Sequence, residues 1–384
     1  MPLIVVYNPA SGDRSAKSTT ETTILPLLTS HNLIPDKVTA TEHVGHAGTL
    51  LVSYIESLSP AALAQGITLV LVSGDGTLHE IVNALYGARA KQQDAPPFPS
   101  LRVVLIPSGT ANALHASFFP PSSAPDAEPT HLASLLSFLS ATPRLVPLTL
   151  ARTTIFPPEA REERSPSSPS TTSESESVVS IVVTSTALHA SILHDSEALR
   201  ATVPGIERFK LAAAQNATTW YRARVRLLAP VQRYDVASDA FVPVPVVAPD
   251  EGARNNKSTT GDDEPPEVLS GPFAYFLSTV NVDRLEPLFR IAPLQRALPP
   301  PRGTRTMDVL AVRPLRDPSL EGKSGDGERE KFKERLWGMF GEAYQDGAHI
   351  HARYDAQDGN ADGQQPVVEY FRVGGWEWIP VSLP

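Results

Sequence analysis

The most constraining feature of the sequence is a series of apolar segments, each of which stops at a group of small residues. LIVVYN at residues 3–8 is followed by PASG, ITLVLVS at 67–73 by GDG, and LRVVLIP at 101–107 by SGTAN. Between them lie segments with helical spacing, such as HAGTLLVSYIESL at 46–58 and TLHEIVNALYG at 77–87. Continuous apolar strands that alternate with helices predict a parallel sheet covered on both faces. We therefore expect an open α/β domain.

The small-residue turns are expected to form one ligand site. In open α/β sheets, ligands bind beyond the carboxyl ends of the strands, where 8–12, 73–77 and 108–112 would meet. Gly74 and Gly76 would allow unusual backbone angles and a close approach of the main chain to a ligand. A helix that begins at Thr77 would offer free amides and a positive dipole end to a phosphate.

Asp75, between the two glycines, has two interpretations. Beside a phosphate site, an acid is best explained as a group acting on the phosphate acceptor or on a metal carried by a nucleotide. The alternative is a solvated tight turn in which the aspartate caps a helix, because Asp is a good cap and Gly-Asp-Gly is common in loops.

Composition narrows the function classes. The 384 residues suffice for two domains, and a formal net charge of -9 argues against a dedicated nucleic-acid binder. Cysteine is absent, which excludes thiolate metal sites and favours an intracellular protein. The first residues read as a strand rather than a signal peptide, and no run reaches the roughly 18 apolar residues of a membrane span. We therefore expect any membrane contact to be peripheral.

Three polar stretches are predicted to be disordered insertions, because they cannot bury enough apolar surface to offset their ordering entropy. They cover residues 157–177, 249–266 and 317–330.

Common phosphate-binding motifs are missing. The sequence has no G-x-x-x-x-G-K-[ST] loop, no full dinucleotide fingerprint after Gly74 and no protein-kinase motif set. Instead, VVYNPASG, VSGDGTLHEIVNAL and IPSGTANALHASFF resemble, in order and spacing, the three nucleotide-site motifs of the diacylglycerol kinase catalytic domain family. The resemblance is greatest to the sphingosine kinase branch of that family.

The resemblance implies an α/β nucleotide-binding domain at residues 1–145 and a β-sandwich lipid-binding domain at 146–384, with the active site in the cleft between them. It also implies ATP and Mg2+ as cofactors and Asp75 as the general base for a lipid hydroxyl. The nucleotide-binding residues it implies in this domain are Asn8, Ser11, Gly12, Thr41, Ser73, Gly74, Gly76, Thr77, Ser108, Gly109 and Thr110.

A fourth block, residues 193–227, resembles the segment of sphingosine kinases that supplies two phosphate-binding arginines, here Arg200 and Arg208. Leu193 stands where that branch has a substrate-binding aspartate, and Asp195 follows two residues later. A fifth block, residues 290–314, resembles the family's late strand pair. The family's C-terminal Asp-Gly-Glu has no clear match.

The fourth block also reverses the charge of the chain. Six basic residues lie between Arg200 and Arg226, against the single acid Glu207. Arg222, Arg224 and Arg226 alternate, so on a strand they would share one face. That face is either an ordinary solvated surface or a contact with anionic lipid headgroups.

These observations predict an ATP-dependent lipid kinase that phosphorylates the primary hydroxyl of a sphingoid base, with diacylglycerol or ceramide as alternative acceptors. A second class is a nucleotide-binding module that has lost turnover. A third is a kinase for a soluble hydroxyl such as that of NAD. The expected partner is a lipid substrate at a membrane surface, and the expected location is cytoplasmic with peripheral association with intracellular membranes.

Overall fold

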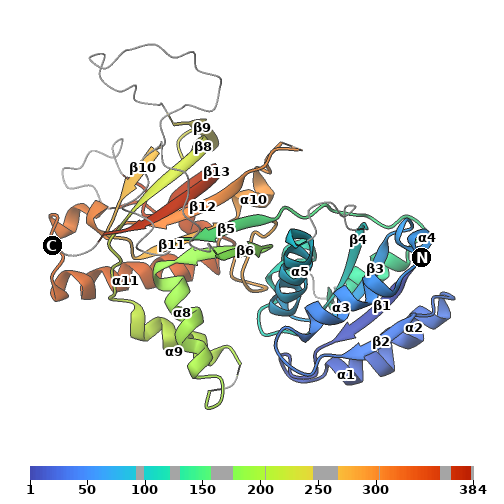
Figure 1. Ribbon diagram of the computed structural model, residues 1–384. Coiled ribbons are helices and arrows are strands. Elements are labelled where there is room, and N and C mark those ends of the chain that lie inside the picture. Colours follow the sequence, from blue (N-terminus) through green and yellow to red (C-terminus); the bar gives the residue numbers. More distant parts are fainter. Residues whose placement is uncertain are drawn as a thin grey trace, which may run out of the picture. The chain divides into compact units, whose positions relative to one another are not determined.

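The computed structural model describes residues 1–91, 99–121, 130–156, 176–203, 205–244, 267–301, 303–354 and 365–381 (Figure 1). The chain divides into two units, Met1–Val182 and Val183–Pro384. The predicted insertion at 249–266 lies outside the described residues, as does most of the one at 157–177. No described helix combines the length and apolarity that crossing a bilayer requires.

The first unit is built on a four-stranded parallel sheet with the order β2-β1-β3-β4. Its strands are β1 (Leu3–Tyr7), β2 (Lys37–Ala40), β3 (Ile67–Ser73) and β4 (Leu101–Pro107). Its helices are α1 (Ala16–Thr19), the π-helix η1 (Thr20–Ile24), α2 (Leu25–Ser30), α3 (His46–Ser57), α4 (Pro60–Leu63), α5 (Asp75–Ala90), α6 (Ala113–Phe118), the 3-10 helix η2 (Thr130–Leu132) and α7 (Ala133–Leu139).

Strand β3 is buried along its whole length because the sheet is covered on both sides. On one side, Val70 and Val72 pack in a core with Ile24, Leu28 and Leu135 of the flanking helices. On the other side, α3 packs closely on α5, where a Cβ on Gly48 would lie 2.5 Å from the Cβ of Ala84. The expected α/β domain is therefore confirmed.

A hairpin completes this unit. Strands β5 (Ala151–Ile155) and β6 (Glu176–Ser180) pair antiparallel, so residues 176 and 177 form a strand rather than the end of a disordered insertion. The Asn83 amide on α5 binds β6 as a neighbouring strand would: its Nδ2 donates to Val179 O at 2.8 Å, and its Oδ1 accepts from Val179 N at 2.8 Å. These bonds join the hairpin to the first unit, which ends at Val182.

The second unit carries a seven-stranded antiparallel sheet with the order β10-β8-β13-β12-β11-β7, and β9 pairs with β8. Its strands are β7 (Val183–Thr186), β8 (Ala223–Asp235), β9 (Ala240–Pro243), β10 (Glu267–Ser270), β11 (Tyr275–Thr279), β12 (Met307–Val312) and β13 (Glu369–Pro380). Its helices are α8 (Ala187–Ala198), α9 (Glu207–Asn216), α10 (Leu294–Ala297), α11 (Asp326–Ala343) and the 3-10 helices η5 (Pro314–Arg316), η6 (Pro318–Leu320) and η7 (Ala348–His351).

Each face of this sheet has its own core. One face packs against α11, with Tyr275 and Leu310 of the sheet in the same cluster as Phe332 of the helix. The opposite face buries a second cluster that includes Val225 and Phe371. The predicted fold class, a parallel α/β domain followed by a β-sandwich domain, agrees with this parallel sheet followed by an antiparallel one.

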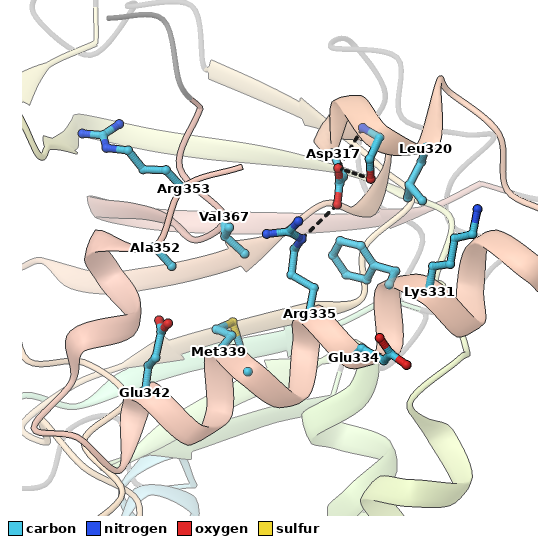
Figure 2. A pocket seen from close by; sticks show the side chains of 13 residues that line it. Asp317, Leu320, Lys331, Glu334, Arg335, Met339, Glu342, Ala352, Arg353 and Val367 are labelled. Atoms are coloured by element: carbon cyan, nitrogen blue, oxygen red, sulfur yellow. Dashed lines mark hydrogen bonds and ion pairs between the residues drawn. The ribbon is translucent and has the colours of Figure 1, made fainter. Parts of the chain in front are cut away.

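The segment 317–330, for which the sequence predicts a disordered insertion, is instead ordered. Asp317 is buried; its carboxylate accepts from Ser319 N at 2.9 Å and pairs with Arg335 Nε of α11 at 3.0 Å. Leu320 enters the core beside α11. Figure 2 shows these side chains around a cavity of about 380 Å³. The prediction was wrong because it judged the segment by local polarity, whereas its ordering comes from contacts with a distant helix.

A buried ion pair holds β12 to β13. Asp308 is fully buried, and its carboxylate accepts hydrogen bonds from Arg372 Nε at 2.8 Å and from the Tyr370 hydroxyl at 2.7 Å. Arg372 also donates to Leu298 O at 2.7 Å. Removing one member would leave the other as an uncompensated buried charge.

We predict that Arg372→Met destabilises the second unit by about 3–5 kcal/mol. The matched control is Arg226→Met, which breaks the half-exposed pair with Glu377 (2.9 Å) and should cost about 0–1 kcal/mol. Urea unfolding followed by tryptophan fluorescence measures both, because all four tryptophans lie in this unit. Equal losses in the two variants would contradict the prediction.

Candidate functional site

Three loops meet at the carboxyl edge of the parallel sheet. Strands β1, β3 and β4 are neighbours that run in the same direction, so their ends at Tyr7, Ser73 and Pro107 lie side by side. Backbone hydrogen bonds join the loops just beyond them: Asn8 N donates to Val72 O at 3.0 Å, and Ser108 N donates to Ser73 O at 3.1 Å. The structure thus brings together the three small-residue turns that the sequence identifies.

Side chains connect the first two loops. Asn8 Nδ2 donates to Thr77 Oγ1 at 3.2 Å, and Thr77 Oγ1 lies 2.6 Å from Ser73 Oγ. Asn8 Oδ1 accepts from Ala10 N at 3.0 Å, which shapes the turn after β1. Ser73 and Thr77 are buried, and the contact between their hydroxyls joins the end of β3 to the first turn of α5.

Glycines let the loops approach one another. A Cβ on Gly109 would lie 2.5 Å from Gly74 Cα, a separation that no side chain can occupy. Gly12 has a φ of +50°, and a Cβ there would meet Ser108 O at 2.3 Å. The three loops are therefore packed backbone against backbone.

The glycines of the Gly-Asp-Gly turn do not adopt the unusual backbone angles that the sequence analysis predicted for them. Neither Gly74 nor Gly76 has a positive φ, and α5 begins at Asp75 rather than at Thr77. Gly74 is required for its contact with Gly109, whereas nothing lies within 4 Å of a Cβ added to Gly76. Gly76 is exposed in the first turn of α5, where helical amides lack intrahelical partners. Open space beside these amides fits the approach of an anion.

Asp75 caps a helix, but not the helix on which it lies. Its carboxylate accepts from Ala113 N at 2.6 Å and from Leu114 N at 3.2 Å, which are the first amides of α6. Burial raises the pKa of Asp75, and the hydrogen bonds from Leu114 and Ala113 lower it by less, so the pKa lies above its ordinary value. Asp75 is half-buried, and the capping role is observed at α6.

His115 is a site residue that the sequence analysis missed. It is 5% exposed and lines, together with Asp75 and Asn112, a small cavity beneath the loops. Its Nε2 has no hydrogen-bond partner among the described residues, and burial lowers its pKa to about 4. Nothing in the spacing of TANALHASFF distinguishes this histidine from a surface residue, so only its burial reveals it.

The remaining predicted residues of the first unit also lie at this edge. Thr41 follows β2, is buried and donates its backbone N–H to Tyr7 O at 2.9 Å. Ser11 N donates to Asn8 O at 3.1 Å, and Thr110 is exposed in the loop after β4. All predicted nucleotide-binding residues of this unit therefore lie at or just beyond the carboxyl ends of β1 to β4: Ser73 ends β3, Gly76 and Thr77 are in the first turn of α5, and the others are in the loops.

Arg200 and Arg208 belong to the second unit, where Arg200 follows α8 and Arg208 lies in the first turn of α9. Arg200 is exposed and pairs with Glu197 at 2.9 Å. Arg208 is 7% exposed, and its Nε has no partner among the described residues. Burial lowers the pKa of Arg208, and the positive charge of Arg200 lowers it further. Two neighbouring cations, one of them buried with an unpaired donor, make a favourable environment for an anion.

Asp195 on α8 is hydrogen-bonded to Asn216 on α9. Its Oδ2 accepts from Asn216 Nδ2 at 2.7 Å, while Leu193 is 46% exposed. The carboxylate nearest to the position of the expected substrate-binding aspartate is thus engaged in joining two helices.

A comparison with protein families finds a match for part of the first unit. Residues 2–137 match the family described as the diacylglycerol kinase catalytic domain. This part of the chain is therefore similar to that family. The match begins just before β1 and ends within α7, so it includes all three loops of the site.

Comparison with curated protein sequences finds no significant match. Solved structures that resemble the chain include two candidate diacylglycerol kinases from Bacillus anthracis strain Sterne. The first has 12% identity and a TM-score of 0.49, covering 99% of this chain and 87% of that one. The second has 11% identity and a TM-score of 0.44, covering 97% and 94%. A diacylglycerol kinase from the same strain has 13% identity and a TM-score of 0.39, covering 81% and 72%.

We predict that Gly109→Ala destabilises the first unit by about 1–3 kcal/mol, because the added methyl group overlaps Gly74. The matched control is Gly76→Ala, which places the same methyl group in open space. Hydrogen exchange measured by mass spectrometry over β3 and β4 should accelerate in the Gly109 variant only. Unchanged exchange in both variants would show that the loops have room that the structure does not provide.

Proposed function

We propose that the chain is an ATP-dependent lipid kinase that transfers the γ-phosphate of ATP to the primary hydroxyl of a lipid. The observation that carries the proposal is the convergence of three glycine-containing loops around the start of α5, with Asp75 as the only acid among the described residues that line the small cavity there. The match of residues 2–137 to the diacylglycerol kinase catalytic domain family supports the same reaction class.

The loops would hold the nucleotide. Residues 8–12 and 108–110 flank the first turn of α5, whose free amides and dipole favour phosphate. The exposed backbone at Gly76 leaves room for a phosphate to approach, and Thr41 lies at the same edge of the sheet. Arg200 and Arg208 of the second unit are proposed as further phosphate ligands, which is consistent with the unpaired Nε of the buried Arg208.

Asp75 would act as the general base. It takes the proton of the lipid hydroxyl while that oxygen bonds to the γ-phosphorus and the bond to the ADP oxygen breaks. A raised pKa makes the carboxylate a stronger base than an ordinary aspartate. Each carboxylate oxygen can accept more than one hydrogen bond, so the two amides that hold Asp75 leave it able to receive the hydroxyl.

Mg2+ is expected as the metal cofactor. The described residues contain no cluster of three or more histidine, aspartate or glutamate side chains suited to a metal. Mg2+ at nucleotide sites commonly uses only one or two carboxylates together with the phosphates, so such a cluster is not required. When bound, Mg2+ would neutralise charge that develops on the phosphates.

The acceptor is proposed to be a sphingoid base, with diacylglycerol or ceramide as alternatives. The resemblance of residues 193–227 to sphingosine kinases supports the first choice. The engagement of Asp195 with Asn216 counts against it, because a sphingoid amine would lose its expected partner. Since each of these acceptors is a membrane lipid, we also propose peripheral association with intracellular membranes.

A non-catalytic nucleotide-binding module is the second candidate. The capping of α6 by Asp75 gives the aspartate a structural role that would persist without turnover. The two candidates differ in what happens when Asp75 is neutralised.

We predict that Asp75→Asn lowers phosphate transfer at least about 100-fold while ATP binding is kept, because the single amide oxygen can still accept one of the two hydrogen bonds from α6 but the side chain is not a base. Purified protein with labelled ATP and Mg2+ would be offered sphingosine, diacylglycerol, ceramide and NAD in parallel. The control is Glu56→Gln, which neutralises an exposed acid on α3. ATP binding without transfer to any acceptor in the wild type would favour the binding module, and full activity in Asp75→Asn would reject the base assignment.

We predict that kcat falls with decreasing pH at a midpoint above 3.8, the ordinary pKa of aspartate, because burial raises the pKa of Asp75. The base exists only above its pKa, so a raised pKa moves the acidic limb upward. Measuring kcat at saturating ATP and lipid separates this ionisation from that of the free substrates. A midpoint at or below 3.8 would mean that a different group limits the rate.

A further inference from the structure

Three arginines occupy one face at the beginning of β8. Arg222, Arg224 and Arg226 are exposed, whereas the residues between and after them, Ala223, Val225 and Leu227, are buried in the core on the opposite face. The alternation expected from the sequence is therefore observed. The three arginine side chains therefore project from the other side of β8, where they are exposed.

Neighbouring strands add aliphatic side chains to the same face, Val268 exposed and Ile379 half-buried. The register pairs Arg226 with Val268 of β10 and Arg224 with Ile379 of β13, and paired residues of adjacent strands project on the same side. Val268 is 49% exposed, and Leu228, two residues after Arg226, is 37% exposed. Figure 1 shows β10, β8 and β13 side by side. We call the surface formed by Arg222, Arg224, Arg226, Leu228, Val268 and Ile379 the arginine face.

Most of the positive charge on the arginine face is uncompensated. Arg226 pairs with Glu377 at 2.9 Å. The side chains of Arg222 and Arg224 have no hydrogen-bond or ion-pair partner in the part of the chain that the structure describes. In a protein with a net charge of -9, two adjacent unpaired guanidinium groups are a local reversal of charge. Such a surface attracts an anionic partner.

We propose that the arginine face docks onto a bilayer that contains anionic phospholipid. Guanidinium groups bind phosphates through several donors, while exposed aliphatic side chains can enter the interfacial region of a bilayer. The aliphatic residues between the arginines distinguish this surface from a nucleic-acid site, which relies on basic and stacking side chains. The inference rests on the proposed function in one respect: a kinase whose acceptor is a membrane lipid needs a surface that meets the membrane.

The test is sedimentation with vesicles of phosphatidylcholine alone and of phosphatidylcholine mixed with phosphatidylserine, without ATP. The wild-type protein should bind only the anionic vesicles, and binding should weaken with salt. The double variant Arg222→Gln/Arg224→Gln should bind about 30-fold more weakly, as expected for the loss of two arginines near an anionic surface. Its matched control, Arg233→Gln/Arg305→Gln, removes the same charge from exposed positions outside the arginine face, one of them on the other side of β8, and should bind as the wild type does.

A second variant tests the aliphatic part. Val268→Ser changes no charge at a half-exposed position, so the fold should persist, as tryptophan fluorescence would verify. It should weaken binding to anionic vesicles several-fold. Equal binding by the wild type and the arginine double variant, or no vesicle binding by the wild type, would overturn the proposal. So would binding of a DNA oligonucleotide that depends on these arginines while vesicle binding does not.

The outcome is separable from that of the proposed function. Asp75→Asn should bind vesicles like the wild type, because Asp75 is not part of the arginine face. Loss of vesicle binding in the arginine double variant together with an absence of phosphate transfer in the wild type would support the surface and reject the kinase. Transfer by a protein that does not bind vesicles would do the reverse.

Discussion

The hydrogen bonds from Ala113 and Leu114 to the Asp75 carboxylate are the interaction on which the geometry of the site depends. They connect the start of α5, after β3, to the start of α6, after β4. Because both helices begin at the same edge of the sheet, one carboxylate fixes the position of two chain segments. The same two hydrogen bonds hold Asp75, the proposed base, in place. The position of the loops and the position of the base therefore depend on one interaction.

The main chains of the three loops also pack directly against one another. Gly74 against Gly109 and Gly12 against Ser108 leave no room for side chains between the loops. Such contacts make the loops rigid, which agrees with phosphoryl transfer, where positioning and charge neutralisation supply most of the rate. Gly76 differs from the others because its surroundings are open, and it is the glycine of the turn that a ligand can approach.

The sequence predicted the α/β class and the meeting of the three turns, since both follow from strand pattern and from the geometry of parallel sheets. It could not predict that Asp75 caps α6, because that contact joins residues far apart in the chain. The same holds for the burial of His115 and for the order at Asp317 and Leu320, which depends on α11. The local sequence pattern indicates secondary structure, but it does not show which distant element will cover a given segment.

The two hydrogen bonds between Asn83 and Val179 connect α5 to the hairpin. The helix that begins at Asp75 continues for 16 residues, and the Asn83 amide fastens it to β6, the last strand before the chain enters the second unit. Asn83 lies about two helical turns after Asp75, so the residue that binds the hairpin and the proposed base are held on one continuous helix.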